Sequence, residues 1–127
     1  MGEPLERRRA PRVALVGRPT AYAQDTVKVW VADLSTTGAR IMLGELLHHG
    51  SSLVLALPPT LGSLTLNARV VWSTIYGGEK TLEGDHHTIY QSGVAFVGLS
   101  LDQQATLARI VESFAQGKAA AHGRESP

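Results

Sequence analysis

The sequence predicts an all-β protein with one C-terminal helix, and three observations lead to that prediction. Short segments of alternating apolar and polar residues, separated by turn residues, extend from residue 13 to residue 97. This pattern is typical of an antiparallel sheet that is closed or nearly closed. One amphipathic stretch follows over residues 101–116. With 127 residues, 43% of them hydrophobic, the chain is expected to form one domain with a single modest core.

Each expected strand is bounded by turn or breaker residues. In chain order the strands are expected at 13–16, 26–32, 39–43, 52–57, 64–72 and 89–97. In the fifth strand alternate residues, among them Leu66, Val70 and Trp72, share one face. Gly93 predicts a bulge in the last strand. Residues 76–87 contain three glycines among charged residues, so a long hairpin loop is expected there.

The helix has recognisable start and stop signals. Ser100 and Gln103 form a capping box, in which each side chain bonds the other residue's backbone N–H. The apolar face consists of Leu107, Ile110, Val111 and Phe114. Gly117 is expected to end the helix, and residues 117–127 are expected to form a disordered tail.

Positive charge is concentrated at the N-terminus, although the formal net charge is only +1. The arginines of this region are Arg7, Arg8, Arg9, Arg12 and Arg18. Residues 1–12 are polar and contain two prolines, which predicts a flexible arginine-rich arm. Binding to long nucleic acid scales with the number of phosphates neutralised and needs a broad basic face. We therefore expect a compact anionic ligand and no long nucleic acid.

Two short segments together suit a dinucleotide that contains guanine. Arg8 and Arg12 carry planar guanidinium forks, which bind phosphate or the O6 and N7 edge of guanine with paired hydrogen bonds. Asp33 can accept from the N1 and N2 donors of guanine, and Ser35 adds a small hydroxyl. Gly38 either lets backbone come close to a ligand or takes a positive φ to end the turn.

The arrangement Arg8-x-x-x-Arg12, followed by Asp33-x-Ser35-x-x-Gly38, resembles the PilZ domain family of bacterial receptors for cyclic di-GMP. The later apolar strand that begins at Gly93 and leads into the helix is similar to the same family, so the likeness covers roughly residues 6–116. It implies a six-stranded antiparallel PilZ-type barrel, split-barrel-like, with a C-terminal helix over residues 13–116. It also implies a receptor and not an enzyme.

The resemblance further implies which residues bind cyclic di-GMP and how the signal is passed on. The implied set is Arg7, Arg8, Arg12, Asp33, Ser35 and Gly38, with Arg7 linked to the binding of a stacked pair of ligand molecules. The arm would close over the ligand and relay the signal to an unidentified protein partner. The contacts made only in the closed state would drive this change.

Several other functions are disfavoured by the residues present. The chain has no cysteine, and the adjacent histidines at 48–49 and 86–87 would point to opposite faces of an extended segment, so no metal site is expected. Trp30 and Trp72 are expected to pack in the barrel or at its rim. Ser100 caps the helix and is not part of a complete nucleophile motif. No apolar segment is long enough for membrane insertion, and we expect a cytoplasmic protein.

Two alternatives belong to other functional classes. An OB-like barrel that binds single-stranded nucleic acid would require several exposed aromatic residues, and only 6% of this chain is aromatic. A PilZ-like adaptor that acts through protein contacts alone would not need the intact motif residues. The sequence leaves open whether the protein is a monomer or a dimer, and which pathway lies downstream.

Overall fold

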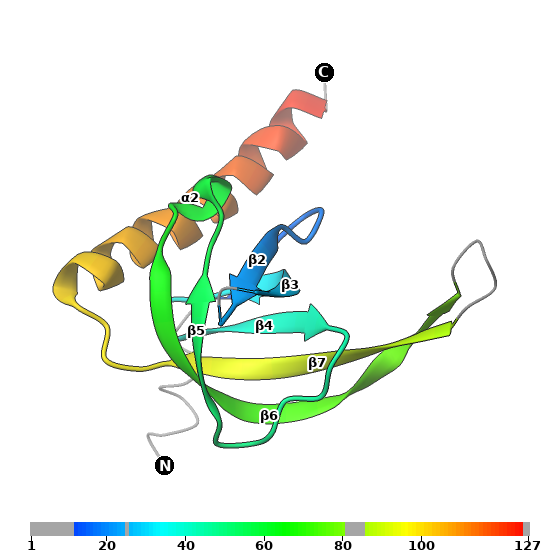
Figure 1. The fold of residues 1–127 in the computed structure, drawn as a ribbon. Helices are drawn as coiled ribbons and strands as arrows, with labels where there is room; N and C mark the ends of the chain where they lie inside the picture. The colour runs from blue at the N-terminus through cyan, green and yellow to red at the C-terminus, as the bar shows by residue number, and fades with distance from the viewer. Residues whose placement is uncertain (1–11, 25, 81–85, 126–127) are drawn as a thin grey trace, which may run out of the picture.

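The computed structural model describes residues 12–24, 26–80 and 86–125. Its elements are β1 (Val13–Ala14), β2 (Thr20–Ala23), β3 (Val27–Leu34), β4 (Gly38–Leu43), β5 (Ser52–Ala56), the short 3-10 helix η1 (Pro59–Leu61), β6 (Thr65–Lys80), β7 (His86–Phe96) and α2 (Leu101–Glu125). The predicted all-β fold with a C-terminal helix is confirmed (Figure 1).

The strands form one closed antiparallel barrel. Hydrogen bonding links them in the order β1-β3-β2-β5-β6-β7-β4, and β4 pairs back onto β3. Six strands, β2 to β7, therefore make the barrel, which confirms the expected number of strands. The expectation that residues 13–16 form the first barrel strand is wrong, because only Val13–Ala14 are a strand and the barrel instead includes β2, which was not predicted. The short strand β1 is an addition: it pairs with the end of β3 at Val13↔Leu34 and Ala14↔Asp33, whereas β2 pairs with the beginning of the same strand.

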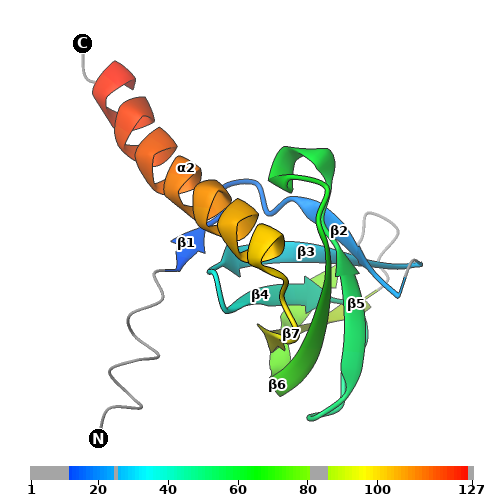
Figure 2. The ribbon, with the colours of Figure 1, turned by 90° about the vertical axis from the view of Figure 1, so that its left-hand side faces the viewer.

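The core lies inside the barrel and beneath the helix. The largest fully buried side chains include Val29 and Val31 of β3, Leu55 of β5 and Leu66 of β6. Figure 2 shows α2 lying across one end of the barrel, beside β1. Leu107 is fully buried there and belongs to the main core cluster, so the helix covers the apolar interior that the open end would otherwise expose to water.

The predicted capping box begins the helix, but the helix extends further than expected. The hydroxyl of Ser100 accepts from the N–H of Gln103 at 3.1 Å, and the Gln103 amide oxygen accepts from the N–H of Ser100 at 3.0 Å. The predicted end at Gly117 is wrong, since α2 continues to Glu125. Consecutive alanines at 119–121 favour helix and partly offset the cost of two glycines, Gly117 and Gly123, at about 1 kcal/mol each. In the described part of the chain no helix has both the length and the apolarity to span a bilayer.

The predicted loop at 76–87 is also wrong for most of its length. The ladder between β6 and β7 continues through Gly77↔Ile89 and Gly78↔Thr88 to Lys80↔His86. The two strands extend beyond the barrel as a two-stranded ribbon (Figure 1). Glycines are compatible with this ribbon because its ladder hydrogen bonds need only backbone groups.

β6 contains two bulges that change the direction of its side chains. The register passes from Val70↔Val94 to Trp72↔Gly93, which leaves Val71 as an extra residue, and a second shift leaves Tyr76 unpaired. The predicted irregularity at Gly93 is therefore present, but the extra residue lies on the neighbouring strand. As a result Trp72 does not share the inward face of Leu66 and Val70, although alternation predicted one common face, and it is 39% exposed.

Candidate functional site

Asp33 lies where three strands meet near the end of β3. Ala14 of β1 pairs with it on one side and Arg40 of β4 on the other. Simple alternation after Val29 and Val31 would point Asp33 into the core. The register between β3 and β4 shifts at Ala32, which leaves that residue unpaired. The bulge turns the Asp33 carboxylate to the outer face and returns Leu34 to the interior, where it is fully buried.

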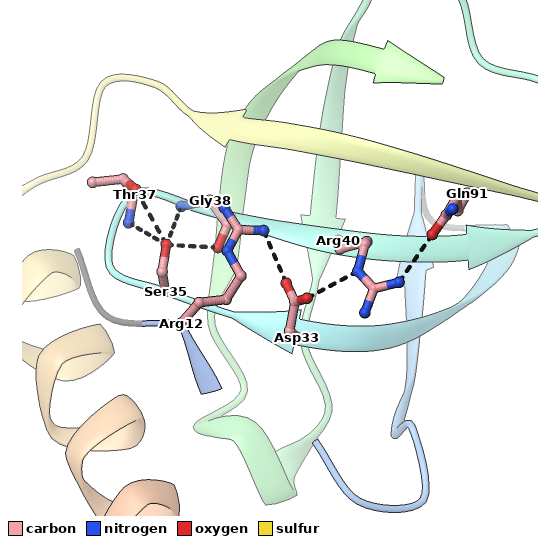
Figure 3. Close-up of polar contacts among 7 residues, drawn as sticks. All are labelled: Arg12, Asp33, Ser35, Thr37, Gly38, Arg40 and Gln91. Carbon is pink, nitrogen blue, oxygen red and sulfur yellow. Dashed lines mark hydrogen bonds and ion pairs between the residues drawn. The ribbon is translucent and has the colours of Figure 1, made fainter. Parts of the chain in front are cut away.

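Two arginines hold the Asp33 carboxylate, one on each oxygen. Nη1 of Arg12, just before β1, donates to Oδ1 at 3.0 Å, and Nε of Arg40, in β4, donates to Oδ2 at 2.9 Å. Arg40 also donates through Nη1 to the amide oxygen of Gln91 in β7, at 2.9 Å (Figure 3). The Asp33 residue is only 7% exposed. The side chain of Arg12 is 50% exposed and that of Arg40 is 34% exposed.

The hydroxyl of Ser35 holds the turn between β3 and β4. It accepts from the backbone N–H groups of Thr37 and Gly38, both at 3.1 Å, and lies 3.1 Å from the Thr37 hydroxyl. The backbone N–H of Ser35 donates to the Gly38 carbonyl at 2.8 Å. Ser35 is almost fully buried. Its bonds fix the hairpin that brings Arg40 back beside Asp33.

Gly38 is required by close strand packing and not by a positive φ. The φ of Gly38 is not positive, so of the two roles expected from sequence the left-handed turn is wrong. A Cβ at this position would lie 2.2 Å from the carbonyl oxygen of Val94. Only glycine therefore allows β4 to start against β7 in the observed register.

A flat aromatic surface adjoins the arginine and carboxylate groups. Gly93 pairs with Arg40 on one side and with Trp72 on the other. A Cβ on Gly93 would lie 2.2 Å from the indole Nε1 of Trp72. The indole therefore lies across Gly93, one strand away from Arg40. One row across three strand pairs contains a carboxylate, a guanidinium group, a glycine and an exposed indole.

The arrangement can bind a planar anionic molecule. Two guanidinium groups around one carboxylate leave an excess of one positive charge. Arg12, just before β1, and Arg40, in β4, also keep N–H donors that do not bond Asp33. The carboxylate can accept N–H groups of a ligand once an arginine releases it. Within the described ranges no cluster of three or more residues suited to hold a metal ion is found.

A family model described as PilZ domain matches residues 6–113. The chain belongs to the PilZ domain family. The match includes the site and the whole barrel, and it extends through most of the part of α2 that packs on the core.

Similar solved structures have the same fold. The PilZ domain of YcgR from Escherichia coli, with c-di-GMP, is 17% identical with a TM-score of 0.66, and the match covers 95% of this chain and 99% of that one. MrkH of K. pneumonia in complex with c-di-GMP is 21% identical with a TM-score of 0.68, over 90% of this chain and 55% of that one. This PilZ domain thus spans about half the length of MrkH. No curated protein matches the chain.

The structure of this PilZ domain brings together only part of the residue set inferred from sequence. Arg12, Asp33, Ser35 and Gly38 meet at one end of β3 and β4, whereas Arg7 and Arg8 lie outside the described residues. Sequence reasoning missed Arg40 and Gln91, and it assigned Trp72 to packing alone. Arg40 had a readable signal, because its apolar neighbours Ala39 and Ile41 in an alternating strand place it on the outer face.

Proposed function

We propose that this PilZ domain is a cytoplasmic, non-catalytic receptor of cyclic di-GMP in bacteria. The observation that carries the proposal is the Asp33 carboxylate, held between Arg12 and Arg40 on the outer face of the barrel. Membership of the family supports it, as do two structural neighbours whose structures contain c-di-GMP.

Guanine competes with an arginine for the Asp33 carboxylate. The N1–H and N2–H groups of guanine donate side by side, and a carboxylate offers about four acceptor positions. Arg12 is the partner that leaves, because it is half exposed and has no second bond among the described residues. Arg40 stays, because Gln91 also holds it, and it fixes the orientation of the carboxylate.

The released Arg12 then binds the ligand itself. Its guanidinium group is suited to a phosphate or to the O6 and N7 edge of guanine. The residues proposed to bind the ligand or to shape its site are Arg7, Arg8, Arg12, Asp33, Ser35 and Gly38. In this set Ser35 and Gly38 act through the geometry of the turn. The segment that ends at Arg12 closes over the ligand, and a protein partner reads the closed state. The contacts unique to that state supply the free energy.

Calorimetric titration with cyclic di-GMP tests the receptor proposal and the role of Arg12 together. The parent protein is expected to bind, and Arg12→Ala is expected to bind at least about 30-fold more weakly, because the desolvated ligand phosphate loses a charged partner. Arg109→Ala, which removes an equal charge from the exposed face of α2, is the matched control and is expected to bind like the parent.

Two results would contradict the proposal. Absence of binding by the parent at near-physiological salt would favour an adaptor that acts through protein contacts. Affinity for single-stranded oligonucleotides that increases with strand length, and falls steeply with salt, would favour the nucleic-acid alternative.

We also propose that Trp72 stacks on a ligand base. Gly93→Ala is expected to displace the indole from its place beside Arg40 and to weaken cyclic di-GMP binding by about 1–2 kcal/mol, the usual scale for loss of base stacking. Trp72→Ala is expected to have a similar effect. The double variant is expected to bind hardly more weakly than either single variant, because both changes remove the same stacking surface, the Trp72 indole. Binding by Gly93→Ala at parental affinity would exclude Trp72 from the site. Gly44→Ala, where a Cβ meets nothing within 4 Å, is the control.

A further inference from the structure

A pocket opens on the same outer face of the barrel as Asp33, further along the strands. Its volume is about 310 Å³, and its described lining residues are Gly17, Arg18, Trp30, Met42, Tyr76 and Ile89. This volume is at the lower end of the range for small-molecule sites, roughly 300–1,000 Å³. The floor is a small apolar cluster outside the main core, formed by Ala32, Met42 and Ile89 with Trp30 packed against it.

Strand pairing places the pocket close to the arginine and carboxylate site. Met42 pairs with Trp30 on one side and with Gln91 on the other, and Gln91 is the residue that holds Arg40. Trp30 precedes Asp33 by three residues on β3, so the two are about 10 Å apart along the strand. A molecule with two planar rings joined through phosphates can therefore contact both places.

Aromatic and cationic groups border the pocket. Tyr76, the extra residue of the second bulge in β6, is turned toward the outer face. Arg18 lies beside it, with its Nη2 at 3.4 Å from the Tyr76 hydroxyl and its Cζ at 5.7 Å from the ring centre. Lys28 places its Nζ at 5.7 Å from the centre of the Trp30 ring. These groups favour an electron-rich planar ring to which a negatively charged group is attached.

The backbone around Arg18 has an unusual conformation. Gly17 has a φ of +81° and Arg18 a φ of +47°, so two consecutive residues are left-handed in the turn between β1 and β2. The left-handed region is natural for glycine and strained for arginine. The turn is held to β3 by hydrogen bonds from Leu15 N–H to the Ala32 carbonyl and from Val31 N–H to the Pro19 carbonyl. It presents the Arg18 side chain at the edge of the pocket.

Resting on the receptor function proposed above, we propose that this pocket is a second purine-base subsite. The base stacks between Trp30 and Tyr76, and Arg18 binds the phosphate that is attached to it. The base belongs either to the second half of the molecule bound at Asp33 or to another ligand molecule stacked against the first. Both sources present the same chemistry, and the stoichiometry of binding distinguishes them.

Arg18→Gly and Tyr76→Ala test the subsite by calorimetry with cyclic di-GMP. Each is expected to lower affinity about tenfold if the base comes from the same molecule, or to abolish a second binding event if it comes from another. Arg18→Gly separates binding from folding, because it removes the guanidinium group and relieves the strained backbone, so the melting temperature is expected to stay unchanged or rise. Tyr22→Ala is the matched aromatic control, since Tyr22 is 46% exposed and Tyr76 is 48% exposed. Arg109→Ala is the charge control.

A direct readout comes from the indole N–H resonance of Trp30 in a ¹H–¹⁵N spectrum, assigned with the Trp30→Phe variant. Saturation with cyclic di-GMP is expected to shift it in the parent and to shift it much less in Tyr76→Ala. Parental binding with an unmoved Trp30 resonance, or parental affinity in both Arg18→Gly and Tyr76→Ala, overturns the subsite and leaves the receptor function intact. No binding by the parent overturns both.

Discussion

Asp33→Asn is expected to weaken cyclic di-GMP binding by about 2–5 kcal/mol, which is about 30- to 4,000-fold. The amide keeps the size of the carboxylate, but it replaces one acceptor oxygen with an NH₂ group that faces the N–H donors of guanine. It also removes the negative charge that holds Arg12 at 3.0 Å and Arg40 at 2.9 Å. Calorimetric titration of the purified variant measures the loss.

The folded barrel itself is expected to tolerate Asp33→Asn. The two arginine side chains are 50% and 34% exposed, so water solvates them once the carboxylate charge is lost, and the free energy of unfolding should fall by no more than about 1 kcal/mol. Asp102→Asn, at an exposed position in the first turn of α2, is the matched control for the loss of one negative charge. If Asp33→Asn bound as tightly as Asp102→Asn, the assignment of the carboxylate to the ligand would be wrong.

Gly38→Ala is expected to destabilise the barrel strongly. The added Cβ would lie 2.2 Å from the Val94 carbonyl oxygen, which is backbone and cannot rotate away. β4 and β7 must separate where Gly38 pairs with Ala95. The cost is at the upper end of the usual overpacking range, about 3 kcal/mol. For a domain of this size the melting temperature should fall by roughly 10 °C or more, as measured by thermal unfolding.

Gly44→Ala is the control for Gly38→Ala. Gly44 follows the end of β4 in an exposed position, where a Cβ meets nothing within 4 Å. The melting temperature of the Gly44→Ala variant should therefore be unchanged or slightly higher than that of the parent. A Gly38→Ala variant that melts like Gly44→Ala but fails to bind cyclic di-GMP would show that Gly38 acts on the ligand and not on strand packing.

Five of the six barrel strands could be predicted, because their signals are local, whereas the short strand β2 was missed. Alternation in β3 and in the first half of β6, and the Ser100 and Gln103 cap of α2, depend on residues close together in sequence. The ends of elements were less predictable. Glycine often ends a helix and is common in turns. Nevertheless α2 continues through Gly117, and the β6–β7 ladder continues through Gly77 and Gly78. Neighbouring propensity and cross-strand hydrogen bonds outweigh the local preference.

The site was predictable only as a pair of motifs. The types of Arg12 and Asp33 indicated the chemistry, because arginine forks and a carboxylate complement phosphate and guanine. The two residues are 21 apart in sequence, and they are in contact because β1 lies beside β3. The bond between Arg40 and Gln91 joins residues 51 apart and exists because β4 pairs with β7 when the barrel closes. No periodicity in the sequence contains that information.

The sequence by itself determined the class of fold, the positions of most of its strands along the chain and the kinds of side chain available for binding. Only the tertiary structure decided which way those side chains point. Single extra residues at Ala32, Val71 and Tyr76 shift the strand register, and one residue of shift moves a side chain from the core to the outer face. These bulges place Asp33, Trp72 and Tyr76 on one surface, because pairing across the closed barrel, and not local propensity, sets the register.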